Sequence, residues 1–288
     1  MTAWFTLLLC SAIAIVTHLS LRDPALKQRL IFDPFLILVR KEWWRLFSSS
    51  LIHADWRHAG FNLFSLYLFG SVVENLYGAP TLIALYVLSV LGGDALSLYL
   101  HRNHQYSALG ASGGVCGVIF GTIFLVPGIE IGDFIMPFGI PGNIYAVAYL
   151  VVTFCALRKG IGSIGHDAHF GGAVVGIVFA FSIRPQLCLA DPLYFWGSIV
   201  FSSFCLYTLF TDPLCLSGKI LPSPIRIRKP KRRKRPTGDI RYDSMIEERE
   251  RQGRIDAILD KISQDGFDSL SPDEQAILQR HSNNIANR

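Results

Sequence analysis

The chain has 288 residues, of which 51% are hydrophobic, 12% aromatic and only 17% charged. This low charge argues against a soluble domain and indicates a membrane protein. Residues 1–218 contain 11 Lys/Arg and 11 Asp/Glu, whereas residues 219–288 contain 16 and 11, so the formal net charge of +5 belongs to the tail. The sequence therefore divides into a neutral apolar body and a basic, polar tail.

Seven apolar stretches are candidate membrane spans, at about residues 2–19, 58–77, 80–100, 112–126, 143–157, 168–184 and 192–210. The first has no Lys/Arg at its start and no small-residue cleavage site after it, so we expect a span rather than a secretory signal. The fourth, as a helix from Gly113 to Val126, would rise roughly 21 Å against a hydrocarbon core of about 30 Å. Such a helix, anchored at its far end, would hold Ser112 below the membrane surface. The connection that reaches it must then be surrounded by protein or water, which implies a hydrated pocket inside the bilayer.

Two connections have membrane-interface character. Residues 20–57 form a long first connection that contains Glu42-Trp43-Trp44-Arg45-Leu46-Phe47. Aromatic and basic residues interleaved in this way suit the headgroup level of a membrane. The connection from Pro127 to Gly142 is apolar and rich in proline, so we expect it at the interface as well.

Glycines recur at short spacings in the fourth stretch, at positions 113, 114, 117 and 121, and in the sixth, at positions 171, 172 and 176. Small residues four apart let helix backbones approach closely in lipid. The pattern predicts that the fourth and sixth helices touch. The six cysteines show neither CxxC spacing nor a companion His/Cys cluster, and we interpret them as buried packing residues.

The tail begins with a basic block at residues 226–236, which proline keeps from being helical. Beside a span, such a block favours contact with anionic lipid or a topology anchor over nucleic-acid binding. Residues 243–263 and a segment capped by Ser271 predict short helices. We expect the membrane body to end near residue 218, followed by a basic linker at 219–241 and a small helical module at 242–288.

Four polar residues lie at the starts of even-numbered spans: His58 and Asn62 in the second, Ser112 in the fourth and His169 in the sixth. The starts of even-numbered spans lie on one face of the membrane, so these side chains can converge at a similar depth. Polar and ionisable residues within spans are costly and indicate function.

The residue types suit nucleophilic hydrolysis. Ser112 supplies a hydroxyl, and His169 can take its proton and return it to a leaving amine. His58 and Asn62, four apart on one helix face, can donate hydrogen bonds to an oxyanion together with the Ser112 N–H. Singly, each residue also fits helix packing or capping, and only their joint placement favours catalysis. A metal site at His58, His166 and His169 is the other reading, but it lacks an acidic or cysteine ligand at convincing spacing.

Several motifs together resemble those of the rhomboid intramembrane serine proteases. They are the tryptophan-arginine stretch Glu42–Phe47, the His53…His58…Asn62 pattern, Gly110-Ala111-Ser112-Gly113 as the GxSG motif, His169 followed by Phe170-Gly171-Gly172, and Glu74 before Gly78. The seventh stretch resembles the extra span of the six-plus-one variants, and the tail resembles a helical module found on some bacterial members.

The resemblance implies an all-α polytopic bundle, with a six-span core at residues 1–190 and a seventh span with its flank at 191–218. It implies a Ser112–His169 dyad and an oxyanion site formed by His58, Asn62 and the Ser112 amide. It implies structural support from Trp44, Arg45 and Glu74. The substrates would be transmembrane proteins cut near the bilayer surface, with no metal, no organic cofactor and no nucleic acid involved. We expect a multi-pass integral membrane protein of the bacterial cytoplasmic (inner) membrane, in contact with lipid.

Two questions stay open at this stage. The connections after the first, third and fifth stretches hold ten Lys/Arg and those after the second, fourth and sixth hold only Arg184, which places the active face in the cytoplasm. Bacterial relatives usually open that face outward, so the two indications conflict. For function, the alternatives are an inactive relative that binds and escorts membrane proteins, and a small-solute channel or carrier, for which the sequence shows no convincing internal repeat.

Overall fold

The computed structural model describes residues 3–102, 106–132, 139–159 and 165–211 of the body. In the tail it describes residues 251, 254–255, 258, 261–262 and 267–286. The chain divides into two compact units, Met1–Ile220 and Leu221–Arg288. The basic block 226–236 and the expected linker 219–241 lie outside the described residues.

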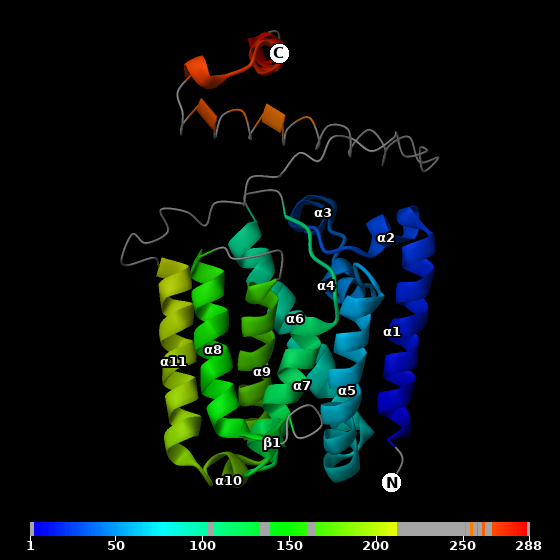
Figure 1. Ribbon diagram of the computed structural model, residues 1–288, viewed down its shortest axis with the longest axis vertical. Coiled ribbons are helices and arrows are strands. Elements are labelled where there is room, and N and C mark those ends of the chain that lie inside the picture. Colours follow the sequence, from blue (N-terminus) through cyan, green and yellow to red (C-terminus); the bar gives the residue numbers. More distant parts are fainter. Residues whose placement is uncertain are drawn as a thin grey trace. The chain divides into compact units, whose positions relative to one another are not determined.

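The body is a bundle of apolar helices, as the sequence predicts (Figure 1). Its long helices are α1 (Trp4–Arg22), α5 (Trp56–Tyr77), α6 (Ala79–His101), α7 (Ser112–Leu125), α8 (Gly142–Lys159), α9 (His166–Ile183) and α11 (Pro192–Thr211). Length and composition make α1, α6, α9 and α11 capable of crossing a membrane, and α7 is a shorter apolar helix. The seven predicted stretches thus all form helices, and the all-α membrane bundle is confirmed.

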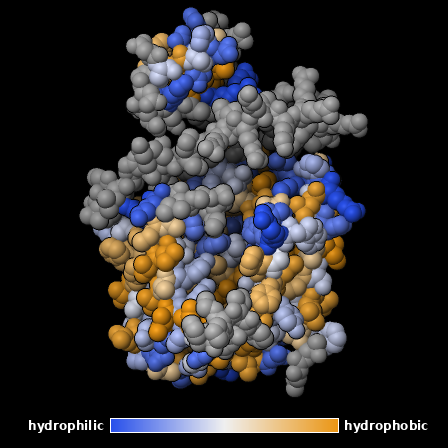
Figure 2. Space-filling view, in the orientation of Figure 1, coloured by the Kyte–Doolittle hydropathy of each residue, from blue (hydrophilic) through white to orange (hydrophobic). Residues whose placement is uncertain are grey.

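The outer helices turn apolar side chains outward. Along α11, the exposed side chains recur every three or four residues and include Leu193, Trp196, Val200 and Phe204. On α1, Phe5, Leu8 and Ile15 are exposed in the same way. Figure 2 shows hydrophobic surface over the sides of the bundle. Because no residue that the structure describes covers these apolar side chains, the faces are suited to lipid.

The centre of the bundle is α7, whose residues are almost all buried. It packs against α9 and α6, and α9 also packs against α6. A Cβ on Gly117 would overlap Ser89 of α6, and one on Gly176 would overlap the carbonyl group of Gly117. The predicted contact between the fourth and sixth helices is therefore confirmed, and it is a close backbone contact that side chains would prevent.

The first connection folds into short helices: α2 (Pro24–Leu30), α3 (Pro34–Arg40), α4 (Arg45–Ser48) and the 3-10 helix η1 (Ser49–Leu51). Two of them begin with an aspartate cap followed by proline. Asp23 accepts hydrogen bonds from the N–H groups of Ala25 and Leu26, and Asp33 accepts one from Leu36. Aspartate at the cap and proline at the first helical position are favoured helix starts. The connection is therefore ordered by local sequence.

The connection after α7 contains a small antiparallel pairing that the sequence did not predict, between β1 (Glu130–Ile131) and β2 (Ile140–Pro141). A short helix, α10 (Pro185–Cys188), joins α9 to α11.

In the tail unit, the 3-10 helix η2 (Phe267–Ser269) precedes α13 (Pro272–Ala286). Ser271 Oγ accepts from the Glu274 N–H at 3.3 Å, and the Glu274 carboxylate accepts from the Ser271 N–H at 2.8 Å. This reciprocal pair is a capping box, so the predicted cap at Ser271 is confirmed.

Candidate active site

Ser112 is the first residue of α7, and the segment before it reaches into the bundle. Ala108 pairs through backbone hydrogen bonds with Phe32, and the Gly110 N–H donates to the Ser49 carbonyl oxygen at 2.9 Å. Figure 1 shows this segment descending beside α6 before α7 begins. The first connection thus satisfies backbone groups of Ala108 and Gly110, which helps to make irregular chain tolerable inside a bundle.

His169 lies in the first turns of α9, next to the contact between α9 and α7. The carbonyl oxygen of Ala168 would lie 3.3 Å from a Cβ on Gly113, and a Cβ on Gly172 would overlap the carbonyl group of Gly113. The residue after Ser112 therefore touches the residue before His169. Both predicted catalytic residues sit at this junction of two helix starts.

The Nδ1 atom of His169 has a hydroxyl partner that the sequence analysis did not identify. Tyr149 of α8 places its Oη 3.2 Å from Nδ1 and 3.0 Å from the Sγ of Cys116 on α7. Cys116 is buried, whereas Tyr149 and His169 are half-buried. A contact at Nδ1 leaves Nε2 as the other ring nitrogen for a reaction partner.

His58 and Asn62 lie in the first turns of α5. The His58 ring lies against Gly110, where a Cβ would come 2.8 Å from the ring Cε1. Gly110 has a φ of +132°, a backbone conformation that favours glycine. Asn62 is buried and donates one Nδ2 hydrogen to the His58 carbonyl oxygen at 2.9 Å, which leaves its second N–H for another acceptor. His58 and the residues just before Ser112 are thus direct neighbours.

His53 is a further histidine of the site, buried under the same segment. Its Nε2 accepts a hydrogen bond from the Ala111 N–H at 3.2 Å, so its Nδ1 carries the proton and lies 2.9 Å from Thr17 Oγ1. Thr17 in turn donates to the Leu51 carbonyl oxygen. Burial, and then the neighbouring His58, lowers the pKa of His53 to about 4. A neutral His53 therefore fixes the backbone next to Ser112.

Asp167 turns away from His169. Its Oδ2 lies 2.9 Å from His101 Nε2 of α6, and its Oδ1 accepts from the Tyr106 hydroxyl at 3.3 Å. The Tyr106 ring stacks on His101 with centroids 3.6 Å apart. These contacts join the start of α9 to the end of α6 and to the segment before Ser112, and they engage both carboxylate oxygens of Asp167 with partners other than His169.

Three residues, Trp44, Arg45 and Glu74, were predicted to support the fold, and the structure shows the surroundings of each. Arg45 is buried, and its guanidinium binds the Glu42 carboxylate at 2.6 Å and the carbonyl oxygens of Gln28 and Ile31. Trp44 is exposed. The Glu74 carboxylate, near the end of α5, accepts from the backbone N–H groups of Phe5 and Thr6 and from the Thr6 hydroxyl. Glu74 thus caps the start of α1 from another helix.

The alternative metal site is not supported. Among the described residues, which include His58, His166 and His169, no group of three or more His, Cys, Asp or Glu side chains is placed to hold a metal ion. Of the cysteines that the structure describes, Cys116, Cys188 and Cys205 are buried, Cys10 is half-buried and Cys155 is exposed. The interpretation of all cysteines as buried is therefore wrong for Cys155, which lies on an outward face of α8.

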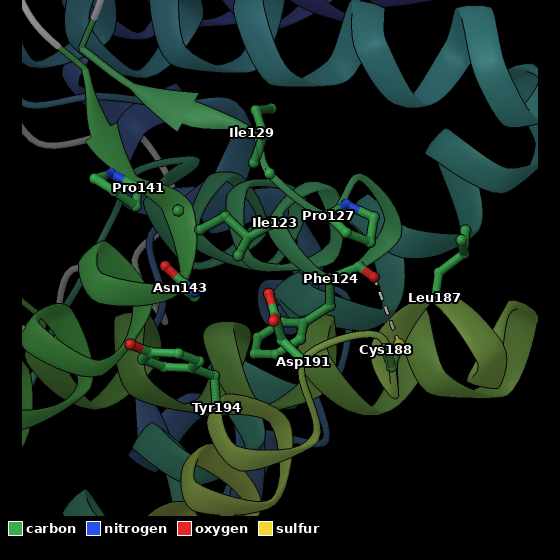
Figure 3. Close-up of a pocket in the computed structure, with 12 residues that line it drawn as sticks. Ile123, Phe124, Pro127, Ile129, Pro141, Asn143, Leu187, Cys188, Asp191 and Tyr194 are labelled. Atoms are coloured by element: carbon green, nitrogen blue, oxygen red, sulfur yellow. Dashed lines mark hydrogen bonds between the residues drawn. The ribbon is translucent and has the colours of Figure 1, made fainter.

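A small pocket of about 100 Å³ lies at the other end of α7 (Figure 3). Ile123 and Phe124 of α7 line it together with residues 127–129 before β1, Pro141 of β2, the start of α8 and α10. Cys188 Sγ donates to the Phe124 carbonyl oxygen at 3.6 Å. It contains no histidine and lies at the end of α7 remote from Ser112. The pocket is therefore separate from the candidate active site.

Residues 40–186, half of the chain, match the Rhomboid domain family. The chain belongs to the rhomboid family. It is an integral membrane protein, and all of the predicted catalytic and oxyanion residues lie within the matched range. Residues 239–284, in the tail, match a family of unknown function (DUF6576).

Curated relatives come from bacteria and eukaryotes. Rhomboid protein 1, mitochondrial, of Saccharomyces cerevisiae is 29% identical over 146 residues, which cover 48% of this chain and 41% of the relative. RHOMBOID-like protein 5 of Arabidopsis thaliana is 26% identical over 186 residues (59% and 58%). Rhomboid protease GlpG of Haemophilus influenzae is 26% identical over 140 residues (49% and 69%). The chain thus spans about half the length of the first two relatives.

Proposed function

We propose that this rhomboid-family chain is an intramembrane serine endopeptidase. Ser112 is the nucleophile and His169 the general base and acid. His58, Asn62 and the Ser112 N–H bind the oxyanion. The observation that carries the proposal is the junction of α7 and α9, where glycine contacts bring the start of the helix bearing Ser112 against the start of the helix bearing His169.

In the proposed reaction, Ser112 Oγ attacks the carbonyl carbon of the scissile peptide bond while His169 takes its proton. The tetrahedral intermediate collapses when His169 gives that proton to the leaving amine, which leaves an acyl ester on Ser112. Water then attacks the ester with His169 again as base, which releases the carboxylic acid and restores the Ser112 hydroxyl. The negative oxygen of each intermediate accepts hydrogen bonds from the oxyanion group.

The proposed substrates are transmembrane proteins cut near the bilayer surface, and the proposed location is the cytoplasmic membrane of a bacterium. Relatives named as rhomboid proteases, from Bacillus subtilis and Haemophilus influenzae, support the first statement. The extra helix α11 and the tail module are proposed additions to a six-span core at residues 1–190. The basic block 226–236 is proposed to contact anionic lipid.

The test is cleavage of a transmembrane reporter substrate by the purified full chain in lipid vesicles, beside Ser112→Ala and His169→Ala variants. Wild-type cleavage that both substitutions abolish would support the mechanism. Cleavage by Ser112→Ala at the wild-type rate would refute it. Binding of the reporter without cleavage, and no labelling of Ser112 by a fluorophosphonate, would favour an inactive relative that escorts membrane proteins.

A further inference from the structure

We propose that Tyr149 and Cys116 are positioning residues that hold His169 in the tautomer that a general base requires. This inference rests on the proposed protease function. It starts from two distances: Tyr149 Oη lies 3.2 Å from His169 Nδ1 and 3.0 Å from Cys116 Sγ. The three groups come from α8, α9 and α7, so the tertiary fold brings them together.

The first step concerns the imidazole of His169. A neutral imidazole has one N–H donor and one acceptor nitrogen. Because Nδ1 is hydrogen-bonded to Tyr149, Nε2 is the nitrogen left to accept the Ser112 proton. Nε2 must therefore be unprotonated. The ring proton is then on Nδ1 and is donated to Tyr149 Oη. The opposite direction, with Tyr149 donating to Nδ1, would put the proton on Nε2 and block the base.

The second step concerns the phenol of Tyr149. A hydroxyl has a single hydrogen to donate. When Tyr149 donates it to Cys116 Sγ, it has none for Nδ1 and can only accept there. Either atom of the Cys116–Tyr149 contact can be the donor; with the phenol as donor, as we propose, the thiol sets the direction of the hydrogen bond at His169. Cys116 follows Ser112 by four residues on α7, which places both on one face of that helix.

The third step concerns rigidity and charge. The Tyr149 ring packs edge-on against Phe120 at 5.6 Å and stacks with Tyr145 at 5.7 Å between centroids, so its hydroxyl has a fixed position. In Ser-His-Asp enzymes a buried carboxylate fixes the tautomer. Here the Asp167 carboxylate is engaged with His101 and Tyr106. The Tyr149 phenol and the Cys116 thiol fix the tautomer of His169 without a second ionised group inside the membrane, where charge is costly.

The kinetic test uses the full chain in vesicles and measures kcat and KM for a transmembrane reporter. Tyr149→Phe and Cys116→Ala should each lower kcat roughly tenfold with little change in KM, as expected for one orienting hydrogen bond. Cys116→Ser keeps an acceptor and should stay within about threefold of wild type. Tyr77→Phe is the matched control, because it removes a hydroxyl that donates to the Leu125 carbonyl oxygen at the far end of α7.

A double variant distinguishes two explanations: a relay, in which Cys116 acts on His169 through the Tyr149 hydroxyl, and two independent packing effects. Without the Tyr149 hydroxyl, Cys116 has nothing to orient, so Tyr149→Phe combined with Cys116→Ala should be no slower than Tyr149→Phe alone. Losses that multiply in the double variant would overturn the relay. A Cys116→Ser rate as low as that of Cys116→Ala would also overturn it.

A second measurement does not depend on proteolysis. Nitrogen-15 NMR of histidine-labelled protein in micelles, with His169 assigned from His169→Ala, reports which ring nitrogen carries the proton. We expect Nδ1 to be protonated in wild type and Nε2 to gain protonation in Cys116→Ala. An unchanged tautomer in Cys116→Ala, or a protonated Nε2 in wild type, would overturn the inference. If wild type fails to cleave any reporter, the function proposal fails while this measurement still decides the tautomer.

Discussion

The carbonyl group of Gly113 occupies the space that a Cβ on Gly172 would need. Two helix starts, each carrying one member of the proposed dyad, therefore approach as closely as their backbones allow. This approach depends on the absence of side chains, and it leads to the first prediction.

Gly172→Ala should separate α7 from α9, because the new methyl group cannot be accommodated by a side-chain movement when it meets backbone. We expect a loss of about 1–3 kcal/mol in the free energy of unfolding. Fluorophosphonate labelling of Ser112 should also fall, and by a larger fraction than the free energy of unfolding. The control is Gly197→Ala on α11, where a Cβ would meet nothing within 4 Å. Equal behaviour of the two variants would contradict the prediction.

Asn62→Ala should slow turnover by about 10²-fold if the free N–H of the amide donates to the oxyanion. The substrate should bind as before, so KM should change little. Ser71→Ala serves for comparison, since Ser71 also lies on α5 and donates to a carbonyl oxygen of its own helix, that of Leu68. A full-rate Asn62→Ala enzyme would remove Asn62 from the proposed oxyanion site.

Arg45→Lys should loosen the first connection although it keeps the charge. A lysine ammonium cannot reproduce the planar set of donors that binds Glu42 and the carbonyl oxygens of Gln28 and Ile31 together. We expect a loss on the order of 2 kcal/mol in stability and faster proteolytic cutting within residues 23–55. Arg29→Lys, at an exposed position of α2, should leave both measurements at wild-type values.

Stability should fall as the pH is lowered from about 6.5 towards 4, in part because of His53. Its pKa in the folded chain is lowered to about 4 by burial, so between these values the unfolded chain binds a proton that the folded chain does not. Stability therefore rises with pH across this window, with at most about 3 kcal/mol from this one group.

The measurement for His53 is the melting temperature in detergent as a function of pH, for wild type and for His53→Gln. Glutamine can accept from the Ala111 N–H but does not titrate in this window. We therefore expect a smaller slope for the variant, whatever its absolute stability. Parallel curves would assign the pH dependence to other groups.

The bundle could be predicted from the sequence because each stretch carries its own hydrophobic signal. The 14-residue length of α7 and the cap at Ser271 followed from local residue order, and both agree with the structure. The contact of α7 with α9 followed from glycine spacing. The short β1–β2 pairing was missed, since its two-residue strands give no periodicity to detect.

The site was predictable only in its outline. Ser112, His169, His58 and Asn62 stand out because polar groups are rare in apolar spans. Tyr149 does not stand out, because a tyrosine in an apolar helix is also expected from packing or from the membrane interface. Nor does Cys116, which is indistinguishable in sequence from a packing residue.

The sequence by itself determined which segments are apolar enough to form the long helices of the bundle, because that apolar character depends on the composition of each segment alone. Only the tertiary structure decided that Tyr149 contacts Nδ1 of His169 and that Asp167 pairs with His101. Such pairings join residues from different helices. They depend on the rotation and depth of each helix in the bundle, which no single stretch of sequence encodes.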